Sequence, residues 1–176
     1  MDSKRQSFRR KCIAGMRGFF VMAAVAMPLL PGQAMAQAPG QQKPVGYGAW
    51  ELVCQESGCA IAHRTVRAVI IFGYNASDGA LVMQVRLPAD APVGRPVAIR
   101  MHKSGTILQM RVTDCGKTFC TASAAPSKMD QVTALFEKEP GGTLGYQLAQ
   151  DMELEVFSLN GFPRALEELR KHPAKK

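Results

Sequence analysis

The sequence is poor in the residues and motifs that carry catalysis. Its three histidines, His63, His102 and His172, do not have the close spacing of a metal-binding pair. It contains no P-loop, no dinucleotide-binding fingerprint and no Gly-x-Ser-x-Gly nucleophile motif. Asp78 lacks the acidic neighbours of a calcium loop, and Asp78-Gly79 is typical of a turn. These absences argue against an enzyme, and we expect no catalytic residue, cofactor or metal.

The sequence also lacks an apolar run long enough to cross a membrane as a helix. The longest run, Gly18 to Leu30, has 13 residues and contains Pro28, whereas a spanning helix needs about 20. A basic amino terminus precedes it and Ala34-Met35-Ala36 follows it, which is the order of a secretory signal peptide. We therefore expect cleavage after Ala36. The product would be periplasmic, outer-membrane-associated or secreted from a bacterium, with no transmembrane span.

Acidic residues are few in the whole chain, but the imbalance lies largely in the predicted signal peptide. The chain has 22 Lys and Arg against 14 Asp and Glu, a formal charge of +8. Residues 1–36 contain 6 of the basic and 1 of the acidic residues, so the 140 residues that follow keep 16 and 13, a charge of +3. A charge this small gives little support to nucleic-acid binding. We expect no nucleic acid as a partner.

Cysteine is scarce, and four of the five cysteines form two short repeats. The repeats have the spacing Cys-x4-Cys: Cys54 with Cys59, and Cys115 with Cys120. Five steps along a straight strand separate two α-carbons by about 16–17 Å, whereas a disulfide tolerates at most about 7 Å. A bond within either pair therefore requires a chain reversal, which Gly58 and Gly116 favour. Export favours two disulfides, with three pairings open, over the alternatives of a zinc site or a redox pair.

Short segments that alternate apolar and polar residues dominate the chain after residue 47. This pattern predicts strands with one buried and one solvated face, at 50–54, 81–87, 97–102, 108–113, 144–149 and 152–156. Helical spacing predicts two short helices, one from Ser127 and one from Pro163. We predict an antiparallel β-sandwich, immunoglobulin-like or jelly-roll-like, with two short helices. Residues 1–36 would be the signal peptide, 37–46 a flexible lead-in and 47–176 a single domain.

Two of the expected strands carry more specific expectations. Residues 69–72, Val-Ile-Ile-Phe, are a continuous apolar run, which is typical of a strand covered on both faces. Residues 152–156 alternate Met, Leu and Val with Glu153 and Glu155. We expect the three apolar side chains of this segment to be buried and the two glutamates to be solvated.

Three arginines lie on the expected outward faces of three strands. They are Arg86, Arg100 and Arg111, with His102 beside them. If the three strands are neighbours, these residues form a basic strip that could bind an anionic lipid or glycan surface, or an acidic partner protein. The alternative is a set of separate, solvated arginines on unrelated strands.

Three further motifs occur in a fixed order after the predicted signal peptide. They are Trp50-x-Leu52-x-Cys54, Cys115-x4-Cys120-x-Ala122, and Ser158-Leu159-x-Gly161-Phe162-x-x-Ala165-Leu166. In this order they resemble the invasion-associated locus B family of bacterial envelope proteins. The resemblance implies an exported, β-sandwich-like domain in the periplasm or attached to the envelope. In pathogens the family is associated with entry into host cells, and it has no established catalytic residue or cofactor to carry over.

The residues and the resemblance together predict an exported, non-enzymatic envelope protein that acts by surface binding. The partner would be an envelope or host protein, or an anionic lipid or glycan surface. One alternative is a structural or assembly protein of the periplasm, with a partner docked on an exposed strand edge. A thiol redox protein is the other alternative.

Overall fold

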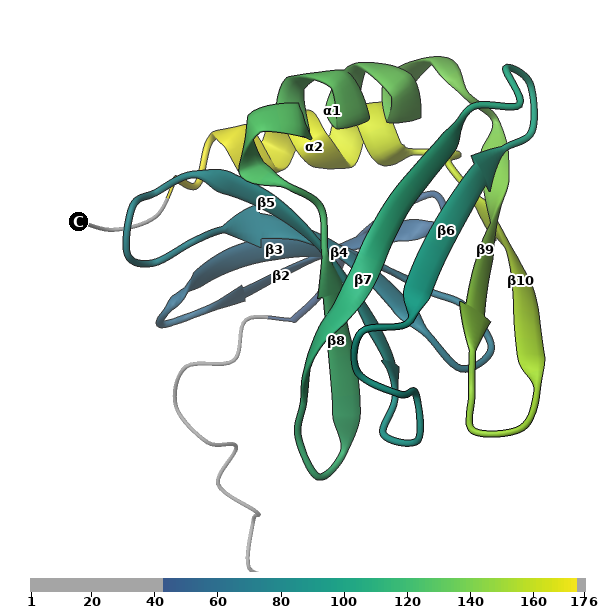
Figure 1. Ribbon diagram of the computed structural model, residues 1–176. Helices are drawn as coiled ribbons and strands as arrows, with labels where there is room; N and C mark the ends of the chain where they lie inside the picture. The colour runs from purple at the N-terminus through teal and green to yellow at the C-terminus, as the bar shows by residue number, and fades with distance from the viewer. Residues whose placement is uncertain (1–42, 174–176) are drawn as a thin grey trace, which may run out of the picture. The chain divides into compact units, whose positions relative to one another are not determined.

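The computed structural model describes residues 43–173 (Figure 1). The predicted signal peptide lies outside these residues, as do residues 37–42 of the predicted lead-in. The first strand begins at Val45, inside the segment expected to be a flexible lead-in.

The described residues form ten strands and two α-helices. The strands are β1 (Val45–Tyr47), β2 (Trp50–Gln55), β3 (Gly58–Arg64), β4 (Val69–Tyr74), β5 (Leu81–Pro88), β6 (Pro96–Met101), β7 (Ile107–Cys115), β8 (Phe119–Ser123), β9 (Gly141–Gln147) and β10 (Met152–Ser158). The helices are α1 (Met129–Lys138), preceded by a 3-10 turn (Pro126–Lys128), and α2 (Phe162–Arg170). The predicted mainly-β class with two short helices is confirmed.

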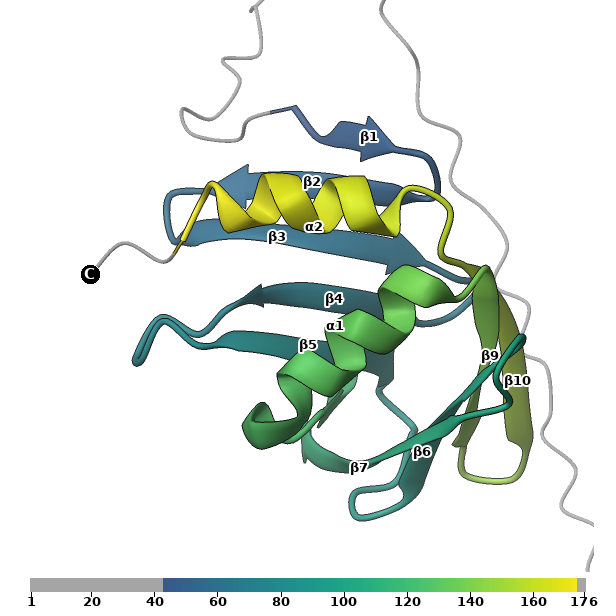
Figure 2. The same ribbon diagram turned by 90° about the horizontal axis from the view of Figure 1, so that it is seen from above.

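All ten strands belong to one antiparallel sheet that is not closed. Its order is β1-β2-β3-β4-β5-β8-β7-β6-β9-β10. The register shifts between Val112 and Asp114 where β7 pairs with β8, and a bulge of this kind bends a sheet. We call β1–β5 with β8 the first half of the sheet, and β7, β6, β9 and β10 the second half. The two halves run in different directions, and the helices lie over β2–β5 (Figures 1 and 2). The sandwich-like form therefore arises from one bent sheet.

The helices cover the inner face of the sheet with a core of aromatic rings. Trp50 on β2 and Phe72 on β4 are fully buried, as are Phe136 on α1 and Phe162 on α2. Ring centroids lie 4.9 Å apart for Trp50 and Phe162, and 5.2 Å apart for Phe72 and Phe136. Edge-to-face aromatic pairs at such distances stabilise a core beyond their buried area. The helices thus leave the opposite, outer face of β2–β5 open.

The two ends of the open sheet meet at a junction between the β1–β2 turn and the chain after β10. The indole N–H of Trp50 donates a hydrogen bond to the backbone oxygen of Ser158 at 3.1 Å. Gly161 has a φ of 87°, and a Cβ at this position would lie 1.9 Å from the backbone oxygen of Tyr47. A side chain at residue 161 would therefore clash with the backbone, so the junction requires glycine.

Each Cys-x4-Cys repeat closes a hairpin turn with its own disulfide. Cys54 and Cys59 pair across β2 and β3, and Cys115 and Cys120 pair across β7 and β8. The α-carbons of each pair are 4.0 Å apart, as the predicted chain reversal requires. Of the three pairings that the sequence left open, the structure has the local one. The four cysteines form two disulfides, so none of them has a free thiolate to bind zinc.

Candidate functional site

The structure divides the predicted basic strip between two parts of the sheet. Arg86, Arg100 and Arg111 are all exposed on the outer face of the sheet, on β5, β6 and β7. Strands β6 and β7 are neighbours, but β8 lies between β5 and β7. Only Arg100 and Arg111 therefore share the second half of the sheet, and Arg86 belongs to the first. His102 follows β6 in a turn, where its Nε2 lies 3.0 Å from the hydroxyl of Thr143.

Strand β10 faces the opposite way from its prediction. Met152 is 66% exposed, and Leu154 and Val156 are each 70% exposed, whereas Glu155 is only 6% exposed. The expectation of buried apolar residues and solvated glutamates is therefore wrong. The reason is that the inner side of β10 meets the turn between β3 and β4, where donors compensate the carboxylates. We call Met152, Leu154 and Val156 the apolar stripe.

Glu155 is buried because it has hydrogen-bond donors from distant parts of the chain. The hydroxyl of Tyr146 and the backbone N–H of Arg67 donate to its carboxylate, and the guanidinium of Arg67 pairs with Glu153 at 2.7 Å. Burial alone would raise the pKa of Glu155, but hydrogen bonds from Thr65, Tyr146 and the backbone outweigh it and lower the pKa. Burial, and then Glu155, raise the pKa of Tyr146. This network joins β10 to the first half of the sheet and has a structural role.

The apolar stripe is part of a larger outer face, which we call the stripe face. Cross-strand pairing places twelve residues on it: Met152, Leu154 and Val156 on β10; Thr143, Gly145 and Gln147 on β9; Pro96, Ala98 and Arg100 on β6; Ile107, Gln109 and Arg111 on β7. None of the twelve is acidic, and two are arginines. A Cβ at Gly145 would lie 3.2 Å from the Leu154 side chain, so Leu154 leans across the glycine. The stripe face thus combines exposed apolar side chains with positive charge.

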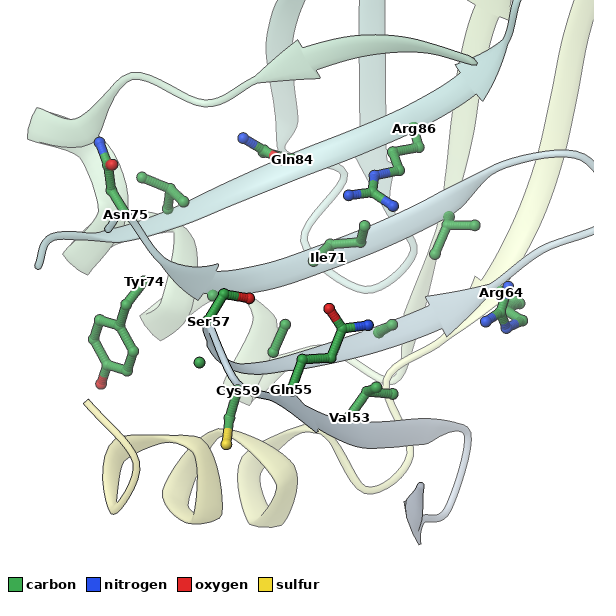
Figure 3. A pocket seen from close by; sticks show the side chains of 16 residues that line it. Val53, Gln55, Ser57, Cys59, Arg64, Ile71, Tyr74, Asn75, Gln84 and Arg86 are labelled. Carbon is green, nitrogen blue, oxygen red and sulfur yellow. The ribbon is translucent and has the colours of Figure 1, made fainter. Parts of the chain in front are cut away.

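A groove of about 560 Å³ lies on the outer face of β2–β5 (Figure 3). Its floor consists of small and medium apolar side chains from four strands: Val53, Ala60, Ala62, Val69, Ile71 and Val82. Arg64 and Arg86 lie at one end, with Gln55, Ser57 and Asn75 toward the other and Ile71 between them (Figure 3). A hollow of this size with an apolar floor and a few polar groups has the character of a small-molecule site.

The groove explains the continuous apolar run of β4. Ile70 and Phe72 are buried under the helices, whereas Val69 and Ile71 are half-buried in the groove floor. The sequence predicted cover on both faces of this strand. Between residues 43 and 173, helices cover the inner face only. The apolar run was a signal for this site, but it cannot distinguish a groove from a second packed layer.

A second hollow, of about 620 Å³, lies between the β3–β4 turn and the end of β10, and His63, His102, Val66 and Val156 line it. Its histidine on β3 is tied to the core. The Nδ1–H of His63 donates to the backbone oxygen of Ala49 at 2.6 Å, and the ring lies 5.5 Å from that of Trp50. His63 therefore has a packing role.

The described part of the chain contains no group of three or more His, Cys, Asp and Glu side chains that could hold a metal ion. None of the helices between residues 43 and 173 is long and apolar enough to cross a membrane.

The fold and the two hairpin disulfides define a class: a mainly-β domain of one bent antiparallel sheet with two helices on its inner face. The sequence matches no known family model and no curated protein. Among solved structures the fold is similar to invasion associated protein B from Bartonella henselae, with a TM-score of 0.61 and 19% identity. The match covers 74% of this chain and 97% of that chain. This likeness shows a shared fold.

The structure also shows what two of those motifs do in this chain. Trp50, from the first motif, packs on Phe162 and hydrogen-bonds to Ser158, both from the last motif. Gly161 of the last motif fits against the backbone of Tyr47. The motif residues therefore contribute to the junction, the core and the disulfides, and none of them lines the groove or belongs to the stripe face.

Proposed function

We propose that the protein is an exported, non-enzymatic envelope protein that acts by binding an anionic membrane surface. The structural likeness to an invasion associated protein supports a related envelope role. Two disulfides are consistent with an oxidising, extracytoplasmic compartment, as is the signal-peptide pattern of residues 1–36. The redox alternative has less support, because both pairs have the spacing Cys-x4-Cys and most redox pairs have Cys-x2-Cys.

The observation that carries the proposal is the stripe face. Large contiguous patches of exposed apolar side chains are rare on soluble proteins, and they mark interaction surfaces where they occur. Here Met152, Leu154 and Val156 lie on β10, at one side of the face. Arg100 and Arg111 lie on β6 and β7, on the same face beyond β9. Arginines bind the phosphates of anionic lipids, while apolar side chains enter the region below the headgroups. The absence of a carboxylate among the twelve residues of the stripe face fits this partner.

The test is cosedimentation of the purified protein with vesicles of phosphatidylglycerol and phosphatidylethanolamine, and with vesicles of phosphatidylcholine alone. We expect binding to the anionic vesicles that weakens at high salt, because surface charges are screened. Arg100→Glu with Arg111→Glu should reduce it at least tenfold without unfolding the domain. The matched control reverses two exposed charges elsewhere, Lys128→Glu with Arg164→Glu. Equal binding by the two double variants would contradict the proposal.

A second candidate is a protein partner docked on β10. This strand is last in the sheet order, with β9 as its neighbour, and its outward side chains are apolar. Edge strands of this kind accept added strands from partners. A photo-crosslinking side chain at Leu154, compared with one at the exposed Val93, separates the candidates. One protein adduct at residue 154, without vesicle binding, would favour the protein partner.

A further inference from the structure

The groove on β2–β5 is a different surface from the stripe face, which it approaches only at the second hollow, where Arg64 and Val156 are both part of the lining. Its floor is apolar and half-buried, yet among residues 43–173 no helix or strand packs on it. Strands β3 and β4 each have a neighbouring strand on both sides. Their apolar floor is therefore not exposed because it lies at an edge of the sheet. Water in contact with this floor is unfavourable, so an apolar ligand segment would gain from displacing it.

Two arginines define the charge of the ligand. In the cross-strand register Arg64 pairs with Val69, and Val69 pairs with Arg86. The two arginines are thus two strand spacings apart, about 10 Å between α-carbons, and both side chains can reach one anionic group above Val69. Arg86 also contacts the ring of Phe119 on the neighbouring strand β8, with its guanidinium carbon 4.7 Å from the centroid. No carboxylate lines the groove.

The floor between the arginines and the far end defines the rest of the ligand. On β3 every second residue faces the groove, which gives Arg64, Ala62, Ala60 and Gly58. These three steps of two residues each make the groove about 20 Å long along the strand. Over this length Ala60, Ala62 and Ile71 offer no hydrogen-bond donor or acceptor from their side chains. Gln84 beside Ile71 and Gln55 toward the far end give a peptide few partners, so most of its backbone amides would lose hydration without compensation, whereas an alkyl chain has no such groups.

We propose that the groove binds a single-chain anionic amphiphile, a long-chain carboxylate. Its carboxylate lies between Arg64 and Arg86, and its alkyl chain extends over Ile71 toward Gln55 and Asn75. The assignment uses residues of the first half of the sheet only. It is therefore independent of the membrane-binding role of the stripe face.

The test is isothermal titration calorimetry of the purified protein with dodecanoate below its aggregation concentration. Two comparison ligands each keep one part of dodecanoate: butyrate has the charged group without the long chain, and 1-dodecanol has the chain without the charge. We expect one dodecanoate per chain, bound at least tenfold more tightly than either comparison ligand. Comparable affinity for 1-dodecanol would overturn the role of the arginines, and comparable affinity for butyrate would overturn the role of the floor.

Two double variants locate the site. Arg64→Gln with Arg86→Gln should weaken dodecanoate binding at least tenfold, and Arg100→Gln with Arg111→Gln on the stripe face should leave it unchanged. Thermal unfolding of both variants checks that each remains folded. Equal losses in the two variants, no binding by the unchanged protein, or preference for an acidic peptide over dodecanoate would each overturn the proposal. Vesicle binding by the same variants reports separately on the stripe face.

Discussion

The two outer faces of the sheet have similar residues and different forms. Each combines apolar side chains with two arginines: Arg64 and Arg86 in the groove, Arg100 and Arg111 on the stripe face. In the groove the apolar residues lie on strands with neighbours on both sides and are half-buried, whereas the apolar stripe lies on the last strand and is 66–70% exposed. Position in the strand order thus decides whether one composition gives a hollow for a ligand or an exposed surface for a partner.

The largest effect should come from breaking the junction that makes the two faces parts of one folded unit. Gly161→Ala places a Cβ 1.9 Å from the Tyr47 backbone oxygen at a φ of 87°. We expect a loss of at least about 3 kcal/mol in the free energy of unfolding, from strain and a backbone clash together. Gly79→Ala is the control, because Gly79 also has a positive φ but open space around it. Its cost should be about 1 kcal/mol.

Urea denaturation of the two variants measures both costs. Similar midpoints would mean that the junction accommodates a side chain by moving. In that case the groove and the stripe face would be coupled less rigidly than the structure shows.

The second effect concerns the carboxylate that holds β10 in its inverted orientation. Glu155→Gln replaces a buried acceptor of two donors, and we expect a loss of about 2 kcal/mol in stability. Glu153→Gln removes a partly exposed ion pair and should cost at most about 1 kcal/mol. Chemical denaturation at neutral pH compares the two. If the Glu153→Gln variant lost more, the stripe would owe its exposure to the ion pair with Arg67.

Glu155 also predicts a difference in the pH dependence of stability between the Glu155→Gln variant and the unchanged protein. The pKa of Glu155 is lowered in the folded protein, so its contribution is complete above the ordinary glutamate pKa of 4.5. It is lost as the pH falls through the lowered folded pKa. Stability of the Glu155→Gln variant should therefore fall less steeply below pH 4.5 than that of the unchanged protein. Thermal unfolding at several acidic pH values measures this slope.

The orientation of β10 also shows where sequence reasoning stops. Local patterns predicted most of the strands and the two helices, because alternation and turn residues act over a few positions, but they left three cysteine pairings open. Residues 152–156 alternate like a core strand, and nothing within the segment reveals that its glutamates face inward. Their compensation comes from Tyr146, 9 residues away, and Arg67, 88 residues away from Glu155. The insertion of β8 between β5 and β7, which divides the predicted basic strip, is likewise a long-range fact.

The third effect distinguishes the two disulfides by their distance from the groove. Each closes a short loop, so removing either by a double Cys→Ala substitution should cost about 2 kcal/mol. Cys59 lines the groove, whereas Cys115 and Cys120 do not. Loss of the Cys54–Cys59 bond should therefore also weaken dodecanoate binding, and loss of the Cys115–Cys120 bond should not. Calorimetry on both folded variants tests this, and a weakening confined to the second variant would contradict it.

The smallest effect on stability should be the most informative about the stripe. Leu154 is 70% exposed, so Leu154→Gln should change the free energy of unfolding by less than about 0.5 kcal/mol. Ile71→Gln, in the half-buried groove floor, should cost about 1 kcal/mol because it removes apolar area that the fold already covers in part. Vesicle binding should fall in the first variant and stay in the second, with dodecanoate binding showing the reverse. A stability loss at residue 154 equal to that at residue 71 would mean that the folded protein itself covers the stripe, and the stripe would then be part of the core and not a surface for a partner.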